Sequence, residues 1–333
     1  MSLDQKIGQL IMVSLTSKSD PDGLSGLIST GRVTGAVLLG SGWTLERAQA
    51  ASTAMAAEAA GQPAMPFVAI DQEGGAVQRL AGAGFDPIPS ASVQGTWTAA
   101  DLTAAATTWG RQLRQAGVNL NLAPVADTVP PGTESANVPV GSYGRQFGSD
   151  PGPVGTAASA FVAGMTAGGV QSCVKHFPGL GRVGVNPDVA GAVDGITGRG
   201  DPYLEAFRQA LAGGAAMVMM SSATYSQIDP GHVAALSPVV IGQVLRGDLG
   251  WGGVVLSDDL DAGAVRSVPV AERAVDFIGA GGDIAMFSLI DDAQVASDGL
   301  RQAAADPAFV TLIDAAATRV LRAKLAAGLL TVG

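Results

Sequence analysis

The sequence predicts an α/β protein with the architecture of a (β/α)8 barrel, in a single domain that spans residues 1–333. Eight short and nearly continuous apolar segments recur along the chain, as in parallel strands that helices cover on both faces. Alanine-rich segments that favour helices separate them, and about 300 residues hold eight such units. In a barrel of this class each strand is followed by a helix, which matches the alternation.

The elements follow in chain order. The expected strands are LIMVSL (10–15), GAVLLG (35–40), PFVAIDQ (66–72), LNLAPVAD (120–127), SCVKHF (172–177), AAMVMMSS (215–222), GVVLSDD (253–259) and GDIAMF (282–287). The clearest expected helices are 45–61, 99–117, 153–169, 202–214 and a closing helix at 309–330, and several end in glycine. A doubly wound open sheet is the alternative, but the count of eight and the lack of a glycine-rich phosphate turn after the first strand disfavour it.

Composition excludes several classes of function. The formal net charge of −10 argues against nucleic acid or an anionic membrane as a partner, because binding phosphate groups requires a basic surface. No apolar run reaches the length of a membrane span, and the first residues lack a signal-peptide pattern, so a cytoplasmic monomer is expected. Cys173 is the only cysteine, and it shares no metal-ligand spacing with His176 or His232, so we expect neither a disulfide nor a metal site.

Polar residues stand where several expected strands end. In a barrel these ends meet on one face, and that face carries the active site. The structural alternative is that each polar residue only caps the helix that follows. Because five of the eight strands end in this way, the pattern favours an active site built from Asp71, Asp127, Lys175 with His176, Ser221 with Ser222, and Asp258 with Asp259.

Three segments supply the ionisable groups of this face. IDQEGGAVQRL (69–80) places two carboxylates near Arg79, GSYGRQFG (141–148) contributes Arg145, and KHFPGLGRVGVNPD (175–188) joins a lysine and a histidine to a glycine-rich loop. Acids flanked by cationic hydrogen-bond donors are typical of a sugar site. A Schiff-base lysine at position 175 is the alternative, but neighbouring carboxylates would keep that lysine charged.

Together these motifs resemble glycoside hydrolase family 3, in its single-domain branch of bacterial β-N-acetylglucosaminidases of cell-wall recycling. The resemblance extends over nearly the whole chain through LDQKIGQLIMV, IDQEGGAVQRL, GVNLNLAPVAD, GRQFGSDP, VKHFPGLG, GVVLSDDL and RVLRAKLAAGLL, in the family's order. It implies a retaining β-glycosidase that forms a covalent glycosyl-aspartate, acts on a small carbohydrate substrate and uses no cofactor.

The resemblance also implies roles for individual residues. Asp258 corresponds to the nucleophile, and Asp259 to a carboxylate that supports the structure. Four residues correspond to those that hold the hydroxyl groups of the sugar: Asp71, Arg145, Lys175 and His176. Arg79 also matches the motif and corresponds to a residue that supports the site.

The chain departs from the family pattern at the proton donor. The typical loop carries a histidine where this chain has Leu180, and it ends in Asp-Ser-His where this chain has Asn186-Pro187-Asp188. Asp188 could replace the missing histidine, if its pKa is raised by burial or by a nearby carboxylate. Glu73 or Asp127 could serve instead, or the protein could bind sugar with weak catalysis.

Two further expectations concern specificity. Ala76 stands where the family has arginine, which suggests that one contact or charge at the rim is missing and leaves a β-glucosidase-type or phosphorolytic activity as an alternative. Gly179, Gly181 and Gly184 suggest a movable loop, as in many active-site lids, although glycines also simply form turns.

Overall fold

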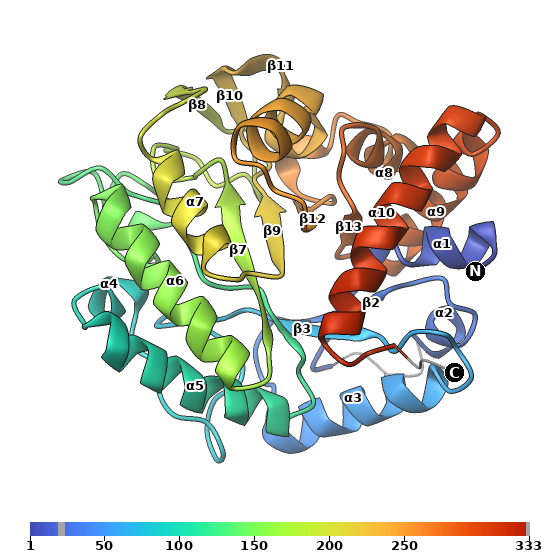
Figure 1. Cartoon of the computed structure of the whole chain (residues 1–333), viewed down its shortest axis with the longest axis horizontal. Coiled ribbons are helices and arrows are strands. Elements are labelled where there is room, and N and C mark those ends of the chain that lie inside the picture. Colours follow the sequence, from blue (N-terminus) through green and yellow to red (C-terminus); the bar gives the residue numbers. More distant parts are fainter. Residues whose placement is uncertain (19–23, 331–333) are drawn as a thin grey trace.

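The structure is a computed structural model and describes residues 1–18 and 24–330. Eight parallel strands close into a barrel in the order β1-β13-β12-β9-β7-β6-β3-β2, which confirms the predicted architecture (Figure 1). Each strand overlaps one of the eight expected segments, and two of them extend one residue beyond the expected bounds, at Thr16 and Gln171. The barrel strands are β1 (Ile11–Thr16), β2 (Gly35–Leu39), β3 (Phe67–Ile70), β6 (Leu120–Asn121), β7 (Gln171–Phe177), β9 (Met217–Met220), β12 (Val254–Asp259) and β13 (Ile284–Phe287).

Helices cover the outside of the barrel (Figure 1). The five expected helices are α3 (Leu45–Glu58), α5 (Ala99–Gln115), α6 (Pro151–Ala167), α7 (Leu204–Ala212) and α10 (Pro307–Ala326). Others were not singled out from the sequence: α1 (Leu3–Gly8), α2 (Ser25–Ser29), α4 (Ala91–Gln94), α8 (Val270–Gly279), α9 (Ile290–Ala303), the π-type segment η4 (Val239–Asp248) and the short turns η2 (Gly141–Tyr143), η3 (Ala234–Leu236) and η5 (Gly263–Val265). No helix in the described ranges is long and apolar enough to cross a membrane.

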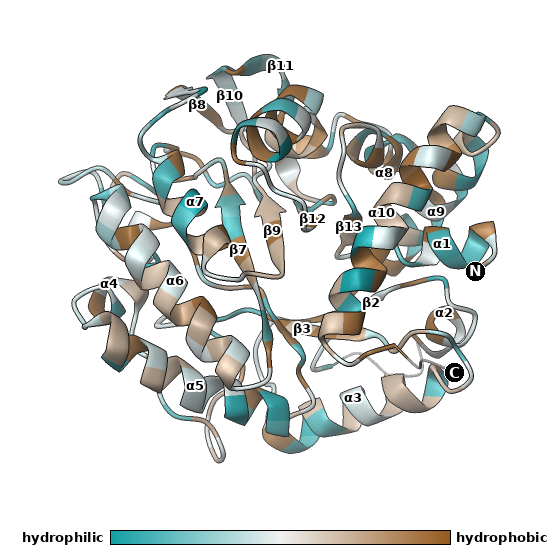
Figure 2. Cartoon of the chain, viewed as in Figure 1, coloured by the Kyte–Doolittle hydropathy of each residue, from teal (hydrophilic) through white to brown (hydrophobic). Residues whose placement is uncertain are grey.

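Local sequence explains where the outer helices begin and how closely they pack. The side chains of Thr44, Thr98 and Asp150 each accept a backbone N–H at the start of α3, α5 and α6, respectively. Glycine lets α6 approach α5, since a Cβ atom on Gly164 would lie 2.5 Å from the Cβ of Ala106. Figure 2 shows β9 in hydrophobic colours, whereas β7 turns hydrophilic toward its carboxyl end, where the site begins.

Two small sheets lie beyond the carboxyl ends of the barrel strands, and neither was predicted. One is the hairpin of β4 (Gln72–Gly74) and β5 (Val77–Gln78), which follows β3. The other has the order β11-β10-β8 and is formed by β8 (Val193–Gly198), β10 (Thr224–Gln227) and β11 (Asp229–Val233). These additions lengthen the loops that surround the mouth of the barrel.

Candidate active site

A cavity of about 230 Å³ lies at the carboxyl end of the barrel. It brings together all seven residues that the sequence analysis assigned to catalysis or sugar binding. They are Asp71, Arg79, Arg145, Lys175, His176, Asp188 and Asp258. Their strands end on one face, as the barrel requires for an active site.

A network of buried ion pairs lines one wall of the cavity. The Nζ atom of Lys175 lies 2.6 Å from Asp71 and 2.7 Å from Glu73. Arg145 holds the same Glu73 through two parallel hydrogen bonds of 2.8 Å and also donates to the carbonyl oxygen of Pro139. Glu73 therefore joins two cations, and its oxygen atoms are fully engaged.

These pairs decide the charge states of the network. Burial alone would raise the pKa of Glu73, but Arg145 and Lys175 outweigh it and hold that pKa far below its usual range. Burial alone would lower the pKa of Lys175, but Asp71 and Glu73 outweigh it and raise that pKa. A lysine kept charged is a poor Schiff-base nucleophile, so the geometry argues against the aldolase alternative.

His176 is oriented from behind by Asp127. Its Nδ1 atom lies 2.7 Å from one carboxylate oxygen, and its backbone N–H donates to the other at 3.1 Å. The backbone N–H of Leu180 donates to that second oxygen as well, at 3.0 Å. The buried Asp127 is thus satisfied by three hydrogen bonds, and it leaves the opposite ring nitrogen of His176 to face the cavity.

Asp258 lies at the end of β12. One of its oxygen atoms accepts the backbone N–H of Asp259 at 2.9 Å, and no described residue donates to the other. Burial and the nearby charge of Asp188 raise its pKa to about 6, although His176 and Lys175 act in the opposite direction. Asp258 therefore combines a free carboxylate oxygen with a position on the cavity wall, which are the attributes of an attacking group.

Asp188 sits on a turn that is fixed to the loop after β12. Its backbone N–H donates to the side chain of Asn186 at 3.1 Å, which forms a local turn. The N–H groups of Gly263 and Ala264 donate to the carbonyl oxygens of Asp188 and Pro187, at 2.9 and 3.0 Å. These bonds hold the turn of Asp188 beside the strand that carries Asp258.

The earlier part of the same loop is held just as firmly. The side-chain amide of Asn137 donates to the carbonyl oxygens of Leu180 and Val183, both at 2.7 Å. A Cβ atom on Gly181 would lie 1.8 Å from the carbonyl oxygen of Thr128, so only glycine fits there. Close packing thus gives Gly181 a structural role, which differs from the expectation that it serves loop motion.

Comparison with known proteins identifies this chain. A sequence model described as the glycosyl hydrolase family 3 N terminal domain matches residues 2–323. The chain belongs to glycoside hydrolase family 3. It is 43% identical to a β-N-acetylhexosaminidase from Beutenbergia cavernae, whose crystal structure superposes with a TM-score of 0.91 over 97% of this chain and 98% of the other.

Two further relatives agree. A β-hexosaminidase from Stenotrophomonas maltophilia is 34% identical over 257 residues, which cover 73% of this chain and 74% of the relative. A family 3 β-N-acetylglucosaminidase from Paenibacillus is 29% identical and has a TM-score of 0.86, over 98% of this chain and 63% of the other. The predicted family and glycoside hydrolase activity are thereby confirmed.

Some residues of this glycoside hydrolase that the sequence placed at the active-site face do not line the cavity. Asp127 and the serines at positions 221 and 222 do not line the cavity, although each follows a barrel strand. Ala76 is exposed near the tip of the β4–β5 hairpin and does not itself line the cavity. Asp259 does line the cavity, but one of its oxygens also accepts the N–H groups of Asp261 and Ser288 and so braces the loops.

The sequence analysis missed the apolar part of the wall. Besides Leu180 and Pro187, it consists of Leu39, Val77, Leu122, Pro139, Met219 and Met286. Met219 and Met286 lie inside barrel strands, where alternate side chains point into the barrel. Strand alternation could have identified them, but apolar side chains there are also normal core residues.

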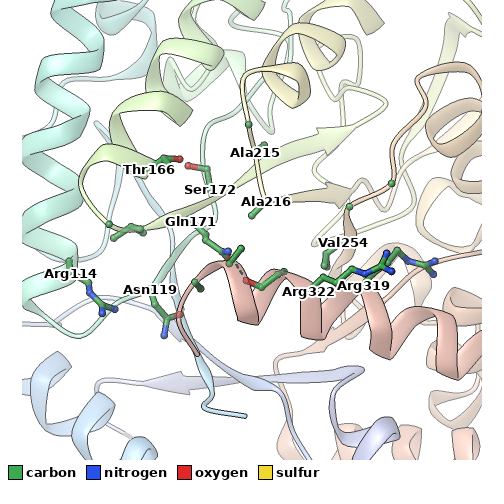
Figure 3. Close-up of a pocket in the computed structure, with 18 residues that line it drawn as sticks. Arg114, Asn119, Thr166, Gln171, Ser172, Ala215, Ala216, Val254, Arg319 and Arg322 are labelled. Carbon is green, nitrogen blue, oxygen red and sulfur yellow. Dashed lines mark hydrogen bonds between the residues drawn. The ribbon is translucent and has the colours of Figure 1, made fainter. Parts of the chain in front are cut away.

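The larger cavity of this glycoside hydrolase, about 640 Å³, lies at the opposite end of the barrel (Figure 3). It borders Gln171 and Val254, the first residues of β7 and β12. Arg114 lies on one side, and Arg319 and Arg322 lie on the other. None of the described residues that line it is acidic, so it offers no carboxylate for glycoside hydrolysis. Nowhere in the described ranges do three or more His, Cys, Asp or Glu residues form a group that could hold a metal.

Proposed function

We propose that the protein is a retaining β-N-acetylglucosaminidase in which Asp258 is the nucleophile and Asp188 is the general acid and base. The observation that carries the proposal is that these two carboxylates share one small cavity with a wall of charged hydrogen-bond donors. The relatives named as β-hexosaminidases and β-N-acetylglucosaminidases support the choice of an N-acetylated sugar.

The ion-pair wall holds the sugar. Lys175 and Arg79 present N–H groups to the cavity, Asp71 presents a carboxylate oxygen and His176 presents a ring nitrogen, so the hydroxyl groups of one sugar ring find donors and acceptors. Arg145 contacts the same cavity while it fixes Glu73. Because the charges already pair with one another, they need little rearrangement when the sugar binds.

The reaction proceeds in two displacements. The Asp258 carboxylate attacks the anomeric carbon while Asp188 gives its proton to the glycosidic oxygen, so the bond to the leaving alcohol breaks and a glycosyl ester forms. Asp188, now a carboxylate, then takes a proton from water as that water attacks the same carbon. The ester bond breaks, the sugar leaves with its original β configuration, and both carboxyl groups return to their starting states.

The geometry favours Asp188 over the two alternative proton donors. Glu73 is bound by two cations that keep it ionised, so it holds no proton to give. Asp127 accepts three hydrogen bonds behind His176 and does not reach the cavity. Asp188 is exposed at the mouth of the cavity, where a leaving group and then water can reach it.

The test compares leaving groups in Asp188→Ala. Loss of the acid slows a disaccharide by about 10²–10⁴-fold but spares the formation of the glycosyl-enzyme from a dinitrophenyl glycoside, whose leaving group needs no proton. Azide needs no base, so it restores turnover of that substrate and yields the β-glycosyl azide. Equal slowing of both substrates without azide rescue would reject Asp188 as the acid and base.

A second comparison tests the sugar and the acceptor. We expect the 2-acetamido aryl glycoside to exceed its 2-hydroxy counterpart in kcat/KM, with the same rate in the presence and absence of phosphate. A preference for the 2-hydroxy sugar would favour a β-glucosidase-type enzyme. Formation of a sugar 1-phosphate would favour phosphorolysis.

A further inference from the structure

Four exposed apolar side chains stand close in sequence to residues that line the active-site cavity. We define the apolar rim as Val138, Tyr143, Val185 and Val189, whose exposed fractions are 42%, 58%, 45% and 74%. Each is within two residues of a cavity-lining residue, namely Pro139, Arg145, Asn186 or Asp188. Exposed apolar side chains that gather at a cavity mouth indicate a binding surface, whereas scattered ones do not.

The cavity is too small for a whole glycoside. Its volume of about 230 Å³ is below the roughly 300–1,000 Å³ of pockets that enclose drug-sized ligands. The charged wall accounts for one sugar ring, so the leaving group has to lie outside, on the rim.

The position of Asp188 gives the direction in which the leaving group lies. In the proposed function, on which this inference rests, Asp188 protonates the glycosidic oxygen and therefore stands on the side of the leaving group. Val189 follows Asp188 directly, and Val185 precedes the same turn. These two valines are therefore the apolar rim residues nearest in sequence to the proposed proton donor.

The chemistry of this side suits an apolar group better than a second sugar. Between Val183 and Val193 the only charged residue is Asp188, and the only other polar side chain is Asn186, whose oxygen already accepts the N–H of Asp188. The hydroxyl groups of a second sugar would lose water there without gaining partners.

The rim is also pre-formed. Its two loops are tied together by the hydrogen bonds from Asn137 to Leu180 and Val183. The turn of Asp188 is tied to Gly263 after β12. A fixed apolar surface binds a ligand without the entropy cost of ordering loops.

We propose that the rim binds the leaving group and that the enzyme prefers β-glycosides with an alkyl or aryl leaving group over those with a second sugar. The preference arises because the valine and tyrosine side chains lose contact with water only when an apolar leaving group covers them.

Four N-acetylglucosaminides test the proposal: the glycosyl fluoride, the methyl glycoside, the hexyl glycoside and chitobiose. We expect the hexyl glycoside to exceed the methyl glycoside in kcat/KM by about tenfold or more, because several methylene groups become buried on the rim. Chitobiose, with a second sugar as its leaving group, should fall below the hexyl glycoside.

Val189→Ser and Tyr143→Ser should each reduce the hexyl-to-methyl ratio by about threefold or more. Both should leave the rate with the fluoride unchanged, since the fluoride has nothing to place on the rim. Val295→Ser is the control, because Val295 is also an exposed apolar residue, at 45%, but lies on the outer helix α9.

The outcomes separate the two proposals. Turnover of the fluoride with no hexyl preference, or with a preference that survives both rim substitutions, would overturn the rim assignment alone. Better use of chitobiose than of the hexyl glycoside would do the same and would favour a sugar-binding rim. No turnover of the fluoride by the wild-type enzyme would overturn the proposed function and the rim assignment with it.

Discussion

The two ends of the barrel differ in what they do with buried charge. At the carboxyl end, Lys175, Asp71 and Glu73 face a cavity of about 230 Å³ and pair with one another. At the amino end, a cavity of about 640 Å³ has a floor rich in glycine and alanine, with arginines at its sides and no acidic side chain among the described residues that line it (Figure 3). Size alone would select the amino end, whereas the arrangement of ionisable groups favours the carboxyl end as the active site.

The difference extends to single buried residues. Lys175 at the carboxyl end is charged because two carboxylates are in contact with it. Lys324 at the amino end is as deeply buried, but among the described residues only the carbonyl oxygen of Thr34 accepts a hydrogen bond from its amine, and the ring of Phe67 lies nearby. The carboxyl end has the paired charges of a reactive site, whereas the amino end has the arrangement of a structural region.

The largest expected effect comes from removing the attacking group. Asp258→Ala should lower kcat with an activated aryl glycoside by at least about 10³-fold, because it removes the proposed nucleophile. Arg322→Ala, on the wall of the opposite cavity, is the matched control and should leave kcat and KM unchanged. More than a few per cent residual activity in Asp258→Ala, or an equal loss in Arg322→Ala, would break the contrast between the two ends.

A smaller effect is expected from breaking the ion-pair network. Lys175→Met should lower kcat/KM by an amount that corresponds to about 2–5 kcal/mol of lost transition-state stabilisation. It should also lower the free energy of unfolding, because Asp71 and Glu73 lose a cation. Thermal unfolding and kinetics measure the two effects separately. The double variant Lys175→Met/Asp71→Asn removes the carboxylate charge that is left without a cation, since Glu73 still pairs with Arg145, so it should regain stability without regaining activity. Recovery of both would mean that Lys175 only supports the fold.

The pH profile gives a finer test of the proximity of Asp188 to Asp258. Burial and Asp188 raise the pKa of Asp258 to about 6, so the ionised nucleophile is lost as pH falls through that value. With an activated aryl glycoside, kcat/KM should then fall about tenfold per pH unit below 6. Asp188→Ala removes one of the two causes, so this limb should move to lower pH. A limb that stays at the same pH would place the charge of Asp188 too far away to act on Asp258.

The barrel could be predicted from the sequence because its signals are local. The run MVMM of β9 and the alanine-rich α5 each reveal their type within a few residues. β8 was missed because its side chains alternate irregularly between buried and exposed, so VDGITG carries no strand pattern. Its pairing with β10 depends on residues that are distant in the sequence.

The site could be predicted only as far as its face. The ends of parallel strands meet whatever their sequence, which is why Asp71, Lys175 and Asp258 could be expected together. Arg145 pairs with Glu73, which lies 72 positions away in the sequence. Local sequence patterns cannot predict an ion pair between residues so far apart. Asp127 obeys the same strand-end rule, yet its carboxylate faces backward to His176 and Leu180, and the rule carries no information on that direction.

The smallest expected effect lies at the amino end, in Lys324. Burial lowers the pKa of this lysine to about 7, whereas an unfolded lysine titrates near 10.4. Between these values the unfolded chain binds a proton that the folded chain does not, so this lysine makes the free energy of unfolding rise with pH. Lys324→Met removes the cost of burying the amine and should stabilise the protein by about 1–2 kcal/mol at pH 7, with an advantage that shrinks toward pH 10. Denaturant unfolding at the two pH values measures it, and kcat/KM should not change. A variant that is less stable at pH 7 would show that the bond to Thr34 outweighs the burial of the amine, and a change in kcat/KM would show that the amino end reaches the active site.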